Sequence, residues 1–300
     1  MALSIVTRTQ GSNEALKSGA VVPDGFTLDF HEVPVLVQAF RRMVRTLEWD
    51  VCEMAFTTYL CAKEHGAPFT ALPIFLVRGL HHAAILRSET VRTPADLHGQ
   101  RVGVNRGYTV TTGVWARGIL ADDYGVDLDQ VTWARSSDEH VAGYEPPPNV
   151  VDLPGGSDVA ALVASGDLAA SVGTESDTLP TLIPDAEEAA YDALLRRGLY
   201  PINHLVVVKD GLLAEHLDLA PALFEAFSEA KRRYVDRLDA IASPSKVDLL
   251  HRRVRDITGE DPLPYGVAPN QAMIDELIRH ALHQKIIKRA PAMAELFATV

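Results

Sequence analysis

Cysteine is scarce in this chain of 300 residues, with Cys52 and Cys61 as its two examples. Two cysteines cannot supply the ligand pattern of a structural zinc site. They belong to one predicted strand–helix unit, and nothing in their spacing requires a disulfide. No HExxH sequence or comparable metal motif occurs, so we predict no metal site.

Basic residues are outnumbered, with 28 Lys and Arg against 40 Asp and Glu and a formal net charge of −12. Nucleic acids and anionic membrane surfaces both require a basic footprint, so we expect neither as a partner. No run reaches the roughly 18 apolar residues that a bilayer-spanning helix needs. The first residues lack the features of a secretory leader, and we therefore expect a cytoplasmic protein.

The clearest local signal is the stretch from 97 to 120, LHGQRVGVNRGYTVTTGVWARGIL. It predicts an apolar strand, a turn rich in Gly and Thr, and a helix that begins near Val110. Free N–H groups in the first turn of a helix, together with the helix dipole, favour a bound anion. Thr109, Thr111 and Thr112 add hydroxyl donors and are candidate substrate-binding residues. The alternative is that these threonines only cap the helix.

Predicted strands alternate with helices up to about residue 210, and the chain is then nearly all helix. This alternation predicts an α/β fold with parallel strands, and the length suggests about two domains. Ligands in such folds bind beyond the carboxyl ends of strands. Residues that follow predicted strands are therefore candidate substrate-binding residues, among them Ser12, Asn13, Thr57 and Glu175. A surface-loop acid is the alternative for Glu175.

The order of elements resembles the type 2 periplasmic-binding-protein fold, in which two α/β lobes enclose a ligand cleft. The phrase TPADLHGQRVGV is similar to the start of the second lobe. The segments DVCEMAFTTYL, PIFLVRGLHHAAI, VWARGILADDYGV, YPINHLVVV and DPLPYGVAPN resemble the 4,5-dihydroxyphthalate decarboxylase family. The resemblance implies an α/β, two-lobed fold with a helical C-terminal tail. It places residues 1–87 and 205–300 in lobe 1 and residues 88–204 in lobe 2.

Several positions depart from the family pattern, and they fall at predicted strand ends, where a ligand is selected. Gln10, Gly11 and Ser12 stand where the family has Tyr-Asp-Arg, and residues 105–108 replace a Pro-Glu-Tyr-Gln run. The family's Arg-His becomes two histidines at 81 and 82. Because the scaffold segments are kept, the resemblance implies a relative with an altered substrate.

Decarboxylation of a hydroxylated aromatic acid needs a cation for the carboxylate that stays and a proton donor for the ring carbon. Arg78 is the candidate anchor, because its guanidinium matches a carboxylate bidentately and stays charged. An ion pair with Asp50 or Glu53 is the alternative for Arg78. A ring hydroxyl can serve as the electron sink, so we expect no cofactor.

The candidate catalytic residues are His82, Glu53 and His204. The resemblance places a histidine at 82, and an imidazole titrates near neutral pH, so His82 is the candidate proton donor. His81 could replace the family's Arg as a substrate-binding cation. Glu53 could be a general acid or base, or it could favour the helix N-terminus that follows it. His204 lies in the apolar run INHLVVV, where a hydrogen-bonded core histidine is the alternative to a cleft-facing one.

The sequence and the resemblance together predict a cofactor-independent decarboxylase of a phthalate-like acid bound in the interlobe cleft. The expected partner is a small anionic aromatic substrate, and the helical tail and the resemblance predict a homo-oligomer. Two alternatives stay open. One is a solute-binding protein for a small carboxylate or other anion, and the other is an enzyme of this fold with another reaction, such as a dehydratase.

Overall fold

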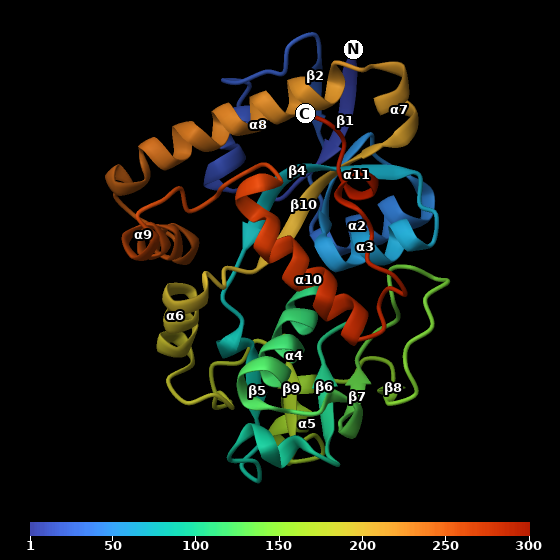
Figure 1. Ribbon diagram of the computed structural model, residues 1–300, viewed down its shortest axis with the longest axis vertical. Helices are drawn as coiled ribbons and strands as arrows, with labels where there is room; N and C mark the ends of the chain where they lie inside the picture. The colour runs from blue at the N-terminus through green and yellow to red at the C-terminus, as the bar shows by residue number, and fades with distance from the viewer. The chain divides into compact units, whose positions relative to one another are not determined.

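The computed structural model describes all 300 residues and divides them into two units (Figure 1). Unit 1 contains Met1–Arg78, Ile202–Ala272 and Pro291–Val300, and unit 2 contains Gly79–Pro201 and Met273–Ala290. The boundaries expected from the sequence assign residues 79–87 and 273–290 to the first lobe. These two ranges belong to unit 2 in the structure, because a strand at 85–87 joins the sheet of that unit and the helix at 271–283 packs on its core.

The sheet of unit 1 has the strand order β2-β1-β3-β10-β4. Its strands are β1 (Ala2–Val6), β2 (Thr27–Phe30), β3 (Val51–Ala55), β4 (Phe69–Arg78) and β10 (Ile202–Lys209). The first three pair in parallel, whereas β10 runs antiparallel to both β3 and β4. The expectation of parallel strands is therefore wrong at β10. This strand follows unit 2 in the sequence and lies between β3 and β4, which both run opposite to it.

Helices and short 3₁₀ turns surround this sheet, and the long helix α8 packs on β4 and on the turn η1 (Figure 1). The elements are η1 (Gly11–Asn13), α1 (Glu14–Lys17), α2 (Leu36–Thr46), α3 (Phe56–Glu64), α7 (Asp210–Glu215), α8 (Leu219–Asp236), η5 (Leu238–Ala240), α9 (Lys246–Thr258), η6 (Ala268–Asn270) and α11 (Met293–Leu296).

The core of unit 1 forms where β3 and α3, both almost fully buried, meet the end of the chain. Phe56 packs against Phe75 and Phe297, with ring centroids 6.1 Å apart in both pairs. The Tyr59 hydroxyl donates to the backbone carbonyl of Leu296, and Phe297 bridges in parallel to Ala71. These contacts fix the last residues of the chain to the sheet.

Unit 2 has a second five-stranded sheet, in the order β5-β9-β6-β7-β8. Its strands are β5 (Ile85–Arg87), β6 (Arg101–Val104), β7 (Thr132–Arg135), β8 (Val150–Asp152) and β9 (Ala170–Val172). Only β5 runs antiparallel to its neighbour. The proline-rich stretch 143–154 contains β8 at the edge of the sheet, where a strand tolerates nearby prolines.

The helices of unit 2 are α4 (Thr111–Tyr124), α5 (Val159–Ser165), α6 (Ala186–Arg197) and nearly all of α10 (Gln271–His283), with 3₁₀ turns η2 (His82–Ala84), η3 (Pro94–Leu97) and η4 (Leu128–Gln130). Helix α4 is buried over most of its length. Gly118 allows close packing against α10, because a Cβ there would lie 2.4 Å from Cε1 of His280.

Two further expectations can be compared with the structure. Cys52 and Cys61 are both buried and form no disulfide. No helix in the structure combines the length and the apolar character that crossing a membrane requires.

Candidate functional site

A cavity of about 740 Å³ opens at the edge of the unit 1 sheet where β1 and β4 end. Its walls are the loop 8–11 after β1, the last residues of β4 (76–78), and parts of α8 and α9. Arg8 and Arg78 bring positive charge to it. The volume suits a small organic ligand, and its position at strand ends is where α/β folds bind ligands.

Glu53 and His204, two of the candidate catalytic residues, lie in contact with each other. Each also neighbours a residue of the cavity wall, because Glu53 binds the N–H of Arg8 and His204 pairs with Val77 of β4. Glu53 at the end of β3 is fully buried, and its Oε1 lies 2.6 Å from Nδ1 of His204 on β10. Its second oxygen accepts the backbone N–H of Arg8 at 2.8 Å. Nδ1 of His204 therefore donates to the carboxylate, and the other ring nitrogen, Nε2, stays available on a side chain that is 14% exposed.

The backbone around His204 is irregular in a way that sets the direction of its side chain. The register between β10 and β4 shifts on both sides of His204, between Ile202 and Val206. Such bulges re-aim a side chain at the edge of a sheet. Phe40 of α2 packs edge-on against the imidazole, with centroids 5.1 Å apart. The ring is thus held by a carboxylate and by an aromatic side chain.

Arg78 ends β4 and is 7% exposed at the cavity wall. Its guanidinium donates to Oδ1 of Asn270, whose amide in turn donates to the carbonyls of Pro264 and Gly266. The two ion-pair partners considered for Arg78 are engaged elsewhere, because Asp50 pairs with Lys209 at 2.9 Å and Glu53 with His204.

Tyr265 belongs to the same cluster. Burial raises the pKa of its phenol well above the usual range, and the charges of Asp261 and Glu53 act in the same direction. The hydroxyl of Ser12 and the charge of Arg78 oppose this rise in the pKa. Ser12 therefore lies near Tyr265, whose phenol stays protonated at neutral pH, and the role of Ser12 in substrate binding stays a prediction.

Two other candidates of unit 1 are part of its framework. The side chain of Asn13 accepts the N–H of Gln10 and donates to the carbonyl of Arg8, so it shapes the loop after β1. Thr57 is completely buried in α3. Their candidate role as substrate-binding residues stays a prediction.

His81 and His82 lie in unit 2, where the chain turns into η2 rather than continuing as a strand. Both are buried. Nε2 of His82 is 3.7 Å from a carboxylate oxygen of Asp123, which also pairs with Arg197, and Nδ1 of His82 is buried without a partner. An acid of its own unit thus lies close to His82.

The anion site expected before α4 is present, and a carboxylate of the chain itself occupies it. Glu139 accepts the backbone N–H groups of Tyr108 and Thr109 at 2.6 and 3.1 Å, and the Thr109 hydroxyl at 2.7 Å. Arg135 adds a donor at 2.9 Å. Gly107 permits this approach, because a Cβ there would lie 2.5 Å from Oε2 of Glu139. Of the three threonines predicted to bind substrate, Thr109 therefore binds Glu139.

The remaining candidates of unit 2 are Thr111, Thr112 and Glu175, and they differ in burial and in position. Thr111 is buried at the first turn of α4, and Thr112 beside it is half-buried. Glu175 lies on an exposed loop after β9. Its surroundings agree with the alternative of a surface-loop acid.

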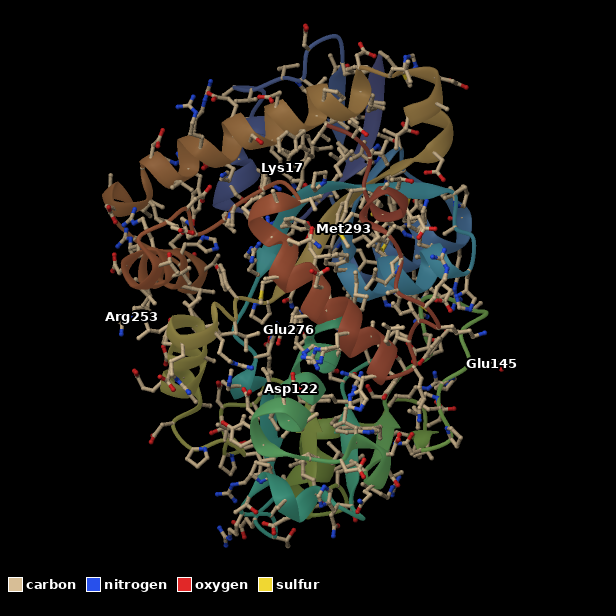
Figure 2. The ribbon with its side chains drawn as sticks, viewed as in Figure 1. Lys17, Asp122, Glu145, Arg253, Glu276 and Met293 are labelled. Carbon is tan, nitrogen blue, oxygen red and sulfur yellow. The ribbon has the colours of Figure 1, made fainter.

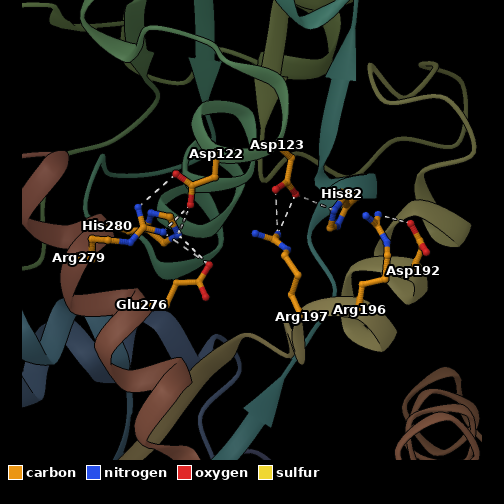
Figure 3. A network of polar contacts seen from close by, with 9 residues as sticks. All are labelled: His82, Asp122, Asp123, Asp192, Arg196, Arg197, Glu276, Arg279 and His280. Atoms are coloured by element: carbon orange, nitrogen blue, oxygen red, sulfur yellow. Dashed lines mark hydrogen bonds and ion pairs between the residues drawn. The ribbon is translucent and has the colours of Figure 1, made fainter.

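One cluster has the residue types of a metal site. Asp122 of α4 and Glu276 of α10 approach each other in Figure 2, and Figure 3 adds His280. Their ligand atoms lie within 4.8 Å of one another. However, the Arg279 guanidinium already binds Asp122 and lies 3.7 Å from Glu276. The cation that balances these carboxylates is therefore a side chain.

Sequence reasoning missed several residues of the unit 1 site. Asn270 and Tyr265 were noticed only as parts of the PYGVAPN segment, which was their one sequence signal. Tyr234 of α8 and His251 of α9 line the cavity from the helical tail. No motif marks these two residues.

The fold identifies the class of protein. A Candida albicans gene product described as having the generic periplasmic binding protein structural fold superposes with a TM-score of 0.54, at 12% identity over 99% of this chain and 93% of that one. The alkanesulfonate-binding protein SsuA from Xanthomonas axonopodis pv. citri gives a TM-score of 0.54 at 14% identity, covering 99% and 98% of the two chains. The desulfurization enzyme DSZB gives 0.55 at 17%, covering 99% and 96%. The chain has the periplasmic-binding-protein fold, as predicted.

Sequence comparison then identifies the relatives within that class. The chain is 29% identical to a 4,5-dihydroxyphthalate decarboxylase from Comamonas testosteroni, over 87% of this chain and 85% of the relative. It is 32% identical to one from Pseudomonas putida, over 45% and 56%. No family model matches the sequence. The chain is thus similar in sequence to two 4,5-dihydroxyphthalate decarboxylases, which confirms the resemblance.

Proposed function

We propose that this protein is a carboxy-lyase that decarboxylates a hydroxylated aromatic acid bound in the unit 1 cavity. The observation that carries the proposal is the Glu53–His204 pair, which neighbours Arg8 and Val77 of the cavity wall, in a chain 29% identical to a named decarboxylase over 87% of its length. The absence of a cofactor, a location in the cytoplasm and a homo-oligomeric assembly are further parts of the proposal, drawn from the sequence and the resemblance.

Each polar group has a role in this reaction. Arg78, held by Asn270, and Arg8 at the rim bind the carboxylate that stays. His204, oriented by Glu53, gives a proton from Nε2 to the ring carbon that bears the leaving carboxylate. The ring hydroxyl keeps its own proton and shares the positive charge of the protonated ring as an oxygen-protonated keto form. The carbon–carbon bond then breaks, its electron pair restores the aromatic ring, and carbon dioxide leaves.

The protein's contribution is mostly placement and electrostatics. The reaction adds one proton to the ring for each carbon dioxide released, so the proton donor must lie within hydrogen-bond reach of that carbon. Glu53 keeps the imidazole in one orientation, as a buried carboxylate does for a catalytic histidine. The positive charge of Arg78 and Arg8 selects an anion with a second acidic group.

The test is carbon dioxide release from a panel of hydroxylated benzoic and phthalic acids, with thermal shift as the binding assay. We expect carbon dioxide release from at least one acid. Arg78→Ala should bind that acid at least about 30-fold more weakly, because losing a desolvated charge pair costs about 2 kcal/mol or more of binding free energy. Arg78→Lys keeps the charge without the bidentate fork and should fall in between.

Two results would contradict the proposal. Strong thermal shifts without carbon dioxide would favour the solute-binding alternative or another reaction at the same site. Unchanged affinity in Arg78→Ala would remove that residue from the binding site.

A further inference from the structure

Three residues on the cavity wall form a hydrogen-bonded chain that the proposed reaction does not use. The Tyr234 hydroxyl of α8 donates to Oδ1 of Asp248 at 2.6 Å and lies 2.8 Å from Nδ1 of His251 on α9. Asp248 is held in turn by the N–H and the hydroxyl of Ser245, each at 2.8 Å, in the capping box of α9. The chain is thus anchored at its far end.

This chain fixes which nitrogen of His251 carries the proton. A phenol has one proton, and Tyr234 gives it to Asp248, so the Tyr234 oxygen must accept from His251. Nδ1 of His251 is therefore the protonated nitrogen, and Nε2 has an open lone pair. Tyr234 has little freedom to rearrange, because its ring packs against Gly11 so closely that a Cβ on Gly11 would lie 2.3 Å from Cε2.

His251 meets the cavity as a neutral hydrogen-bond acceptor. It lines the cavity wall and is 5% exposed. Burial, with a smaller contribution from the charge of Arg78, lowers its pKa from 6.5 to about 4, and Asp248 and Asp261 only partly oppose this. An acceptor lone pair repels a carboxylate and attracts an O–H group. The cavity therefore has cations at the strand ends and an O–H acceptor on the helical side.

We propose that His251 is a specificity-determining residue that accepts a hydrogen bond from a ring hydroxyl of the substrate at Nε2. Tyr234 and Asp248 are positioning residues that hold the required tautomer. The proposal rests on the proposed function, because it concerns the same cavity and the same class of aromatic acid. It names the hydroxyl as the group by which this site separates hydroxylated acids from unsubstituted ones.

The test uses calorimetry at pH 7.5 to compare the binding of 4,5-dihydroxyphthalate and phthalate, which differ only in the two ring hydroxyl groups. We expect the intact protein to prefer the hydroxylated acid by about tenfold or more, since an unpaired buried acceptor costs roughly 1–3 kcal/mol. His251→Leu should lose that preference while binding phthalate within about threefold of the intact protein. His251→Gln, whose amide oxygen is an acceptor, should recover part of it.

Tyr234→Phe provides a second variant that leaves His251 in place. Without the phenol the tautomer is no longer fixed, and we expect a reduced preference for the hydroxylated acid. The ¹⁵N spectrum of His251 should show a protonated Nδ1 and a bare Nε2 in the intact protein, and a mixture in this variant. A purely structural role for Tyr234 would leave the tautomer unchanged.

The outcomes separate the two proposals. The role of His251 would be overturned if His251→Leu lost affinity equally for both acids, or if the intact protein had no preference for the hydroxylated acid. Either result would leave the decarboxylase proposal standing. Binding of neither acid, with no carbon dioxide release from the panel, would overturn both.

Discussion

Replacing Glu139 by alanine should destabilise unit 2 and create a site for a free anion. The substitution removes the acceptor of two backbone N–H groups and the Thr109 hydroxyl, and it removes the buried carboxylate that pairs with Arg135. Breaking a buried charge pair costs about 3–5 kcal/mol. Arg135 keeps its bond to Asp152, so we expect the lower end, about 3 kcal/mol, or a fall in Tm of roughly 6 °C or more.

Formate or acetate should restore most of this loss in the Glu139→Ala variant. An anion at about 100 times its Kd stabilises a folded protein by about 2.7 kcal/mol. Thermal denaturation across a formate series measures the effect, with chloride as the ionic-strength control. Glu145→Ala is the matched control, because Glu145 is an exposed acid of the same unit, at the edge of the view in Figure 2. A loss below about 1 kcal/mol in Glu139→Ala, or equal stabilisation of both variants by formate, would refute the reasoning.

Three further predictions follow from single side chains. His251 has a pKa of about 4 in the folded protein and 6.5 in the unfolded chain, so the unfolded chain binds the proton first as the pH falls. The free energy of unfolding should therefore decrease between pH 6.5 and pH 4. Urea denaturation should show a decrease at most about 3 kcal/mol larger in the intact protein than in His251→Gln. Gly118→Ala should cost about 1–3 kcal/mol in the same assay, because its Cβ meets the buried His280, whereas Gly155→Ala, with open space around it, should be neutral. Burial raises the pKa of the Cys52 thiol, so iodoacetamide should modify it only after unfolding, as mass spectrometry would detect.

Local sequence signals predicted the part of the site that strand ends create. Apolar runs located β3, β4 and β10, and the rule that ligands bind beyond strand ends selected Glu53 and Arg78. The contact between Glu53 and His204 could not be predicted as a pair. It depends on β10 running antiparallel beside β3, with His204 opposite Ala55, and this register is set by tertiary packing between segments far apart in the chain.

Other parts of the site depend on long-range contacts that no local pattern encodes. The hydrogen-bond donors before α4 were predicted, but not that Glu139, about 30 residues further on, would accept hydrogen bonds from them. Asn270 and His251 come from the helical tail, whose amphipathic pattern indicates that a face is buried without indicating against which sheet edge. The departures from the family pattern at Gln10 and Gly11 do lie on the cavity wall.

The most direct test of the central claim follows the carboxyl carbon itself. Hydroxylated phthalic acid labelled with ¹³C in its carboxyl groups is incubated with the intact protein and with His204→Asn, and ¹³CO₂ and remaining acid are measured by NMR. We expect the intact protein to release labelled carbon dioxide and a ring-protonated product. We expect His204→Asn to bind the acid and to release little. Bound acid that keeps all of its label in the intact protein, or full release by His204→Asn, would contradict the account.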